Sequence, residues 1–428
     1  MHFFISSGIT YLLCIIFSSN KNLPEIVFLW AMGYMVAAHA YRMKETWDIT
    51  YFLKEFDFTG TQMVLTMKLT SFAYNLYDGT TDKANVFRTL DKDSKTFKRD
   101  DRVFADRKKF AIDKLPNPLE FFGYIFCFTC LLAGPAFEYG DYIKSIDGRI
   151  FDRKQQNNSG QPSSILPALQ RLGVGVICLV LHLQLTGNIF NVDKFPNFKL
   201  STVCDKIHVN NNDIYYRYIF LWMALLAERF KYYFAWKVAE GSSILAGFGF
   251  EGYNEEGKVK GWAGVNNIDI IGFETAGSVQ ILSKAWNKRT QGWLQRYTYH
   301  RYNDSLNITY FVSAIWHGLY PGFFFFFMSL PLMTEIERMF QKKINPIVIP
   351  SYGPPKFQIP STPVGLIYKV LCQIGTTLGM NYVVQTFPLG TYDNCITALG
   401  SFKFLGHIAF IILFVVLTVT PGPKTKKG

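Results

Sequence analysis

Eight apolar runs recur along the chain and set its architecture. They cover residues 3–17, 26–41, 119–137, 172–190, 214–227, 306–333, 364–384 and 404–420. Several carry no charge over about 15 to 20 residues, which approaches the length that a helix needs to cross the hydrocarbon core of a bilayer. The pattern predicts an all-α polytopic membrane protein, a multi-helix bundle with about 8–11 membrane helices plus re-entrant and interfacial helices.

Three more polar segments are expected inside or beside this bundle. Residues 60–77 contain one interior charge, Lys68, among many Thr and Ser side chains, which is typical of an interfacial or cavity-lining helix. Residues 228–262 mix charges with aromatic side chains and cannot face lipid throughout, so we expect them against the bundle interior or at its mouth. The glycine-interrupted run 241–250 is predicted to be buried or re-entrant. We expect one integral-membrane domain over residues 1–428.

Composition and charge agree with this class. The 428 residues are 49% hydrophobic and 17% aromatic, with only 18% charged, and the net charge of +12 lies in the loops. Such charge is expected to face anionic headgroups and anionic cytosolic ligands, and it does not indicate nucleic-acid binding, because no soluble basic domain carries it. Cys127-x-x-Cys130 has neither a second cysteine pair nor a nearby His, so we expect free thiols and no metal site.

Residues 305–334 contain the most informative anomaly. These thirty positions hold no Asp, Glu, Lys or Arg, and their one side chain that titrates near neutral pH is His317. An imidazole at membrane depth is by default a functional-site hypothesis, although a hydrogen-bonded core histidine is the alternative. In a continuous helix, Tyr310, Ser313, His317 and Tyr320 would share one polar stripe. Pro321 would open that helix at His317, because proline clashes with the carbonyl four residues before it.

A second segment, residues 286–301, is amphipathic and basic. Trp286 and Trp293 recur at helical spacing, with Lys288, Arg289 and Arg296 between and after them. One interpretation is an interfacial anchor helix. The other is a basic, aromatic cytosolic entrance for a phosphate-bearing cofactor. Both can hold.

These motifs carry a family resemblance. WHGLYPG (316–322), preceded by WNKRTQGWL (286–294), resembles the membrane-bound O-acyltransferase family and, within it, the lysophospholipid acyltransferase branch. Further similar pieces are spread over nearly the whole chain. They are FDFTGTQMVLTMKLTSFAYNLYDG (56–79), LPNPLEFFGYIF with LAGPAFEYGDY (115–142), RFKYYFAWKVAEG with AGFGF (229–250), and YVVQTF (382–387).

The resemblance implies a fold, a reaction and a catalytic pair. The fold is a helical bundle around a chamber that opens to the cytosol for acyl-CoA and sideways to the membrane for the lipid. The family's catalytic His and upstream Asn match His317 and Asn287. His317 would be the general base for the attacking hydroxyl, and Asn287 would orient a substrate or stabilise the oxyanion. Candidate substrate-binding residues are Trp286, Trp293, Arg296, Ser313, Trp316 and Tyr320.

The expected activity is therefore transfer of a fatty acyl chain from acyl-CoA, a co-substrate, to the free hydroxyl of a lysophospholipid. No bound cofactor, metal or covalent acyl-enzyme is expected, because no G-x-S-x-G elbow occurs and no Cys neighbours His317. Alternatives are a sterol, diacylglycerol or protein acceptor, or a transporter in which His317 relays protons. No internal repeat of the kind that transporters show is visible. The positive charge of the tail Lys424-Thr425-Lys426-Lys427-Gly428 favours a cytosolic C-terminus. The tail also resembles a dilysine signal for the endoplasmic reticulum membrane, and a generic basic tail is the alternative interpretation.

Overall fold

The computed structural model describes residues 1–45, 58–92, 94, 96–152, 162–189, 214–348 and 362–422. Within these ranges the chain forms no β-strand, and one isolated bridge joins Tyr253 and Val259. The elements of the first half are α1 (His2–Ile16), α2 (Leu23–Glu45), α3 (Thr59–Gly79), α4 (Lys83–Val86), α5 (Phe97–Phe110), α6 (Pro118–Ile125), α7 (Tyr139–Ile146), the 3₁₀ turn η1 (Arg149–Phe151), α8 (Ile165–Gln184) and the π-helix η2 (Leu185–Ile189).

The second half begins with the longest helix, α10 (Ile214–Leu245). It is followed by η3 (Ala263–Val265), α11 (Ile270–Glu274), α12 (Val279–Ala285), α13 (Lys288–Leu294), the π-helix η4 (Gln295–Tyr299), α14 (Leu306–His317), α15 (Pro321–Lys343), α16 (Asn345–Val348), α17 (Pro363–Val384), α18 (Thr386–Leu389), α19 (Tyr392–Ser401) and α20 (Leu405–Val419). The all-helical prediction is confirmed.

Two of these helices are both long and apolar enough to cross a bilayer unaided, over Leu23–Lys44 and Ile165–Gly187. A third crossing results if α19 and α20, which meet at a bend of 73°, are counted as one broken span. Helices α3, α10, α15 and α17 have at least 21 residues each but are less apolar, because polar groups interrupt them. The total of about 8–11 crossings stays a prediction.

The apolar side chains of α8, α17 and α20 point outward. On α20 they include Ile411, Ile412 and Val415, each at least half exposed, and Ile177 of α8 is 60% exposed. Contiguous exposed apolar surface on a helix bundle marks a face that lipid or protein covers. These helices therefore present the lipid-facing surface that the sequence pattern predicts.

Helix α3 shows the opposite pattern, because nearly all of its side chains are buried. Lys68 is fully buried, and its ammonium group donates to the carbonyl oxygens of Tyr124 and Ile125 at the end of α6. A buried charge is tolerated when such acceptors surround it. Helix α3 therefore lies at the centre of the bundle, where its polar side chains meet partners from other helices.

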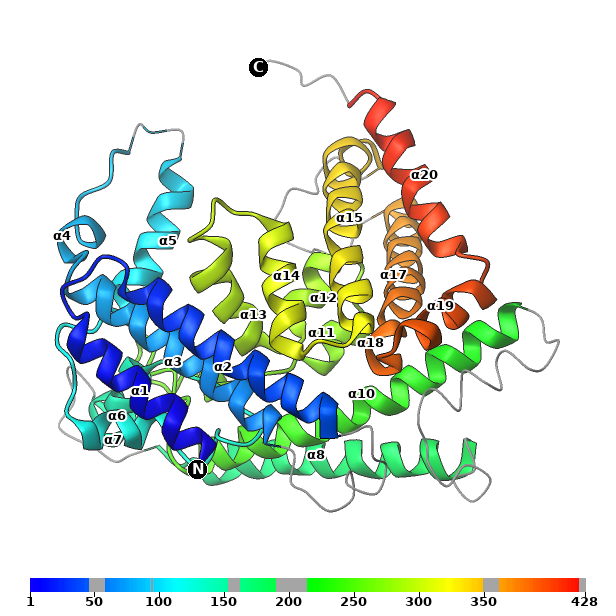
Figure 1. Ribbon diagram of the computed structural model, residues 1–428. Helices are drawn as coiled ribbons and strands as arrows, with labels where there is room; N and C mark the ends of the chain where they lie inside the picture. Colours follow the sequence, from blue (N-terminus) through cyan, green and yellow to red (C-terminus); the bar gives the residue numbers. More distant parts are fainter. Residues whose placement is uncertain are drawn as a thin grey trace.

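Figure 1 shows the arrangement of the bundle. Helices α8 and α10 run alongside each other at the bottom of the view, and α15, α17 and α20 stand together above them on one side. Helices α1 to α3 lie on the other side, with α13 and α14 between the two groups. A buried cluster of Met35, Met67, Trp293, Tyr297 and Trp316 fills this middle region, where α2, α3, α13, η4 and α14 meet. Of the candidate site residues, Trp293 and Trp316 belong to this cluster, whereas Trp286 packs in a separate cluster with Trp236.

Two boundary predictions were wrong or incomplete. The run 119–137 is not one helix: α6 ends at Ile125 and turns follow. The run that starts at residue 214 continues as helix to Leu245, because its charges are paired inside the protein. One such pair joins Arg229 Nε to Glu274 Oε1 at 2.8 Å, and another joins Lys237 to Glu240 at 2.7 Å. Hydropathy alone does not detect charges that find partners in the fold.

The stretch 305–334 is also not one continuous helix. Helix α14 ends at His317, Gly318 adopts φ 139°, and Pro321 is the first residue of α15. The helix therefore breaks at His317 as proline chemistry predicts, and Pro321 occupies the position where its missing N–H costs nothing. Gly322 is needed for packing, because a Cβ there would collide with the carbonyl oxygen of Thr386.

Candidate active site

His317 is the last residue of α14, and its ring is fixed by one backbone contact. Its Nδ1 lies 2.7 Å from the carbonyl oxygen of Ser313, one turn earlier. Because a carbonyl oxygen only accepts, Nδ1 must carry the proton and donate it. The other nitrogen, Nε2, has no hydrogen-bond partner within the described part of the chain. A neutral His317 therefore presents a free basic nitrogen in a fixed orientation.

Aromatic rings surround this imidazole. The ring centroids of Trp316, Phe327 and Phe387 lie 4.6, 4.8 and 5.1 Å from that of His317, and the Trp316 and Phe387 rings stand edge-on to it. They come from α14, α15 and α18, which converge at the break after His317. The immediate surroundings of the base are therefore apolar.

Asn287 lies immediately before α13 in the left-handed backbone region, at φ 40° and ψ 55°. Asparagine adopts this conformation more readily than most residues. Its Oδ1 accepts a hydrogen bond of 3.0 Å from the Thr290 hydroxyl. The Met67 sulfur lies 3.3 Å from the same hydroxyl but is a weaker acceptor. The Asn287 Nδ2 has no partner among the described residues, so both of its N–H groups are free to donate.

The fold brings Asn287 and His317 to the same end of a helical hairpin. Helix α13 continues into η4 and spans residues 288–299, and the chain then reverses into α14, residues 306–317. Figure 1 shows these two arms side by side. The start of α13 and the end of α14 lie against the same part of α3, because Thr290 contacts Met67, Trp316 donates to the Met63 carbonyl oxygen, and the Trp293 and Trp316 ring centroids are 6.0 Å apart. One group that can accept a proton and one that can donate hydrogen bonds therefore share that end of the hairpin.

The aromatic candidates lie around this pair in packing positions. Trp293 is 2% exposed and donates from Nε1 to Thr70 Oγ1 at 2.9 Å. Trp316 is 4% exposed and donates to the carbonyl oxygen of Met63 at 3.1 Å. Trp286 packs edge-on against Trp236, with ring centroids 4.9 Å apart. These contacts anchor the hairpin on α3 and α10, and a direct contact with substrate stays a prediction for all three tryptophans.

The polar stripe of the sequence is shorter than predicted. Ser313 and His317 lie one turn apart on α14, and Ser313 acts through its carbonyl oxygen. Tyr320 lies beyond the break, as the residue before α15, with its ring edge-on to Phe323 at 6.0 Å. The prediction that Tyr320 continues the stripe was wrong, because the helix does not extend past His317.

Arg296 is held by an internal ion pair. Its guanidinium contacts Glu138 Oε1 at 2.6 Å, and Tyr297 donates to the other oxygen of the same carboxylate at 3.0 Å. Arg301 is paired in the same way with buried Asp78. Arg289 has no ion pair within the described residues, and Lys288 is exposed. Lys288 is therefore the more accessible cation, whereas the Arg289 Nε is buried.

His39 of α2 belongs to the site, and we did not single it out from the sequence. It is 7% exposed, and its Nε2 lies 3.2 Å from the carbonyl oxygen of Trp316. That carbonyl lies at the end of α14, where no later N–H of the helix reaches it. His39 therefore caps the helix that ends in His317. The sequence does contain a signal for His39, because it is an isolated histidine inside the apolar run 26–41.

Replacing His39 with alanine is expected to lower kcat about tenfold, because the end of α14 loses its cap and His317 loses its fixed position. His39→Gln, which retains an N–H donor, should restore most of the rate. The measurement is kcat and KM of purified variants with matched thermal unfolding curves. An unchanged kcat in a folded His39→Ala protein would remove His39 from the site.

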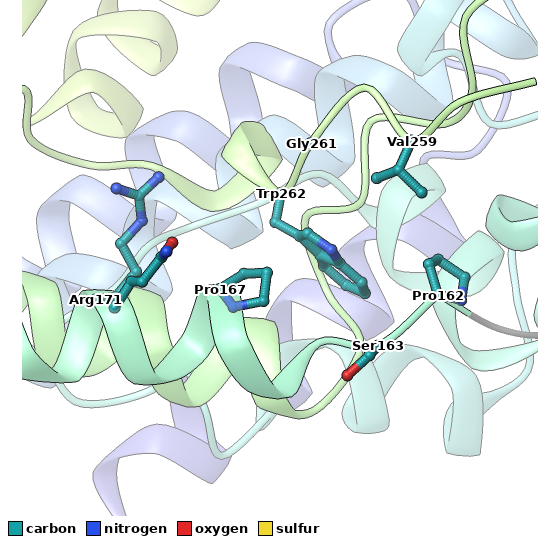
Figure 2. A pocket seen from close by; sticks show the side chains of 8 residues that line it. Pro162, Ser163, Pro167, Arg171, Val259, Gly261 and Trp262 are labelled. Carbon is teal, nitrogen blue, oxygen red and sulfur yellow. The ribbon is translucent and has the colours of Figure 1, made fainter. Parts of the chain in front are cut away.

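A cavity of about 390 Å³ lies at the start of α8 and does not include His317 or Asn287. Figure 2 shows Trp262 and Arg171 on its walls. Its lining residues are Pro162, Ser163, Pro167, Gln170, Arg171, Val259, Gly261 and Trp262. Arg171 also donates to Asn266 Oδ1 at 3.1 Å, so the cavity borders the loop that supports Asn287.

Comparison with known proteins decides the family. The family model of the membrane-bound O-acyltransferases matches residues 46–353, a region that contains both Asn287 and His317. The chain belongs to the membrane-bound O-acyltransferase family. This O-acyltransferase is 30% identical over 441 residues to membrane-bound glycerophospholipid O-acyltransferase 2 of Gallus gallus, across the whole of this chain and 76% of the relative.

Two fungal relatives extend the comparison. The O-acyltransferase is 30% identical over 421 residues to the lysophospholipid acyltransferase of Schizosaccharomyces pombe, across 95% of this chain and 74% of the relative. It is 29% identical over 438 residues to the lysophospholipid acyltransferase of Saccharomyces cerevisiae, across 99% of this chain and 66% of the relative. The similarity therefore includes both arms of the hairpin and the helices that pack against them.

Proposed function

We propose that this protein transfers a fatty acyl chain from acyl-CoA to the free hydroxyl of a lysophospholipid. The observation that carries the proposal is similarity over at least 95% of the chain to two fungal relatives named lysophospholipid acyltransferases. The free Nε2 of His317 and the free Nδ2 of Asn287, at one end of the hairpin, supply the two groups that the reaction requires.

The chemistry follows from these two groups. An alcohol is a weak nucleophile, so His317 Nε2 takes the hydroxyl proton as the oxygen attacks the thioester carbon. Asn287 Nδ2 donates to the thioester oxygen as it gains negative charge. When the carbon–sulfur bond breaks, the imidazolium returns the proton to the departing CoA thiolate. The products are a diacyl phospholipid and free CoA, and His317 is neutral again.

The surroundings support a lipid substrate. The rings of Trp316, Phe327 and Phe387 around His317 favour an acyl chain, and Lys288 and Arg289 follow Asn287 directly in the chain. Cations there can bind the phosphate groups of CoA or of the lysophospholipid headgroup. The endoplasmic reticulum membrane is the proposed location. It rests on the tail at Lys424–Lys427, which lies outside the described residues, as does the predicted cytosolic C-terminus.

The test is release of free CoA by purified protein with oleoyl-CoA and a panel of acceptors. The panel contains lysophosphatidylcholine, lysophosphatidylethanolamine, lysophosphatidylserine, cholesterol, diacylglycerol and a peptide with a free serine. We expect turnover with at least one lysophospholipid and a diacyl product of matching mass. Turnover with only cholesterol, diacylglycerol or the peptide would overturn the acceptor class. Proton-driven flux in vesicles without CoA release would overturn the enzyme proposal.

A further inference from the structure

The residue that precedes α13 does not cap the helix with its side chain. Asn287 occupies the position before the helix, where an asparagine side chain usually accepts from the second or third N–H of the helix. Here the Asn287 side chain accepts from no backbone N–H of the helix, and its Oδ1 accepts instead from the Thr290 hydroxyl. The first N–H groups of α13, on Lys288 and Arg289, therefore need acceptors from elsewhere.

Asn267 supplies both acceptors. Its carbonyl oxygen accepts from the Lys288 N–H at 2.7 Å, and its side-chain Oδ1 accepts from the Arg289 N–H at 3.2 Å. Asn267 is 2% exposed, and its Nδ2 has no partner within the described ranges. An asparagine twenty positions earlier in the chain thus caps α13 in place of Asn287.

Helix α10 holds Asn267 in this position. Fully buried Glu240 accepts from the N–H groups of Asn267 and Ile268 at 2.7 and 3.1 Å. Lys237 donates to the Ile268 carbonyl oxygen at 2.9 Å and to Glu240 at 2.7 Å. The Asp269 N–H donates to the carbonyl oxygen of Ala285 at 2.9 Å. Residues 267–269 therefore hydrogen-bond to the chain on both sides of Asn287, at Ala285 before it and at Lys288 and Arg289 after it.

We propose that Asn267 is a positioning residue for Asn287. By capping α13 it satisfies the helix end and leaves the Asn287 carboxamide free to donate to the substrate. Without the Asn267 oxygen, the nearest acceptor for the open N–H groups is the Asn287 side chain, which would turn back toward the helix and leave the reaction centre. The proposal rests on the proposed function only in giving Asn287 a task in acyl transfer.

The test compares Asn267→Ala with the wild type, using whichever acyl acceptor the wild type turns over. This choice separates the proposal from the identity of the acceptor. We expect kcat to fall on the order of 10–100-fold, with KM for acyl-CoA and acceptor within about threefold of wild type. Asn267→Asp retains an oxygen at the capping position and is expected to keep kcat within about threefold of wild type.

Two further comparisons separate positioning from a general structural role. The double variant Asn267→Ala/Asn287→Ala should have the same kcat as Asn287→Ala alone, because Asn267 acts through Asn287. The matched control is Asn266→Ala, which removes the neighbouring asparagine that bonds Arg171 and not α13. We expect that control to keep the wild-type kcat. Multiplied losses in the double variant, or equal losses in Asn266→Ala and Asn267→Ala, would overturn the proposal, as would a loss in Asn267→Asp as large as that in Asn267→Ala.

Discussion

Replacing His317 with alanine is expected to reduce kcat by about 10²–10⁴-fold, because the attacking hydroxyl loses the base that takes its proton. Among the described residues the ring bonds only the Ser313 carbonyl oxygen, so its removal should leave α14 intact. Binding of both substrates depends on other groups, so their KM values should change little. The measurement is CoA release by purified protein under saturating substrates, with retention of monodisperse elution in detergent.

The chain offers a matched control for this variant. His182 of α8 also contacts a backbone carbonyl oxygen, that of Ala227 on α10, through Nδ1 at 2.8 Å. His182→Ala therefore removes a histidine with the same kind of contact from a helix that carries none of the candidate residues. We expect it to retain the wild-type kcat. A folded His317→Ala protein with the turnover of His182→Ala would show that His317 is a core histidine and not the base.

The sequence located the two central residues because their signals are local. An isolated histidine in thirty residues without Asp, Glu, Lys or Arg is visible without a fold, and Pro321 predicts the helix break beside it. Asn287 was found through the family pattern and not through its own surroundings. Its neighbours in space, Thr290 and Met67, come from the same helix and from α3, and only the fold brings Met67 there.

The parts that sequence reasoning missed depend on partners far apart in the chain. Arg296 was predicted at a substrate entrance, but Glu138, 158 positions earlier, pairs with it. The caps of the hairpin are equally remote, since His39 lies 277 positions from Trp316, and Asn267 lies 22 positions from Arg289. Hydropathy detects an unpaired charge and a paired one in the same way, so it cannot distinguish an entrance from an internal ion pair.

Replacing Asn287 with aspartate is expected to lower kcat by about 10²–10³-fold, the loss typical of removing one oxyanion donor. Aspartate has the same size, tolerates the left-handed backbone at φ 40° and can accept from Thr290 as asparagine does. It therefore can keep the hydrogen bond from Thr290 while it removes the two N–H donors of Nδ2 and adds a negative charge.

The comparison of Asn287→Asp with Asn287→Ala distinguishes two roles of Asn287, donation to the thioester oxygen and support of the backbone turn before α13. If Asn287 donates to the thioester oxygen, both variants should lose activity, because neither presents a donor and the aspartate adds negative charge where negative charge develops. If Asn287 served only the backbone turn before α13, aspartate would keep the wild-type kcat and only alanine would lose it. The measurement is kcat in single-turnover and steady-state CoA release. A loss of kcat in both variants therefore reports on the Nδ2 donor, whereas a loss in Asn287→Ala alone reports on the backbone turn before α13.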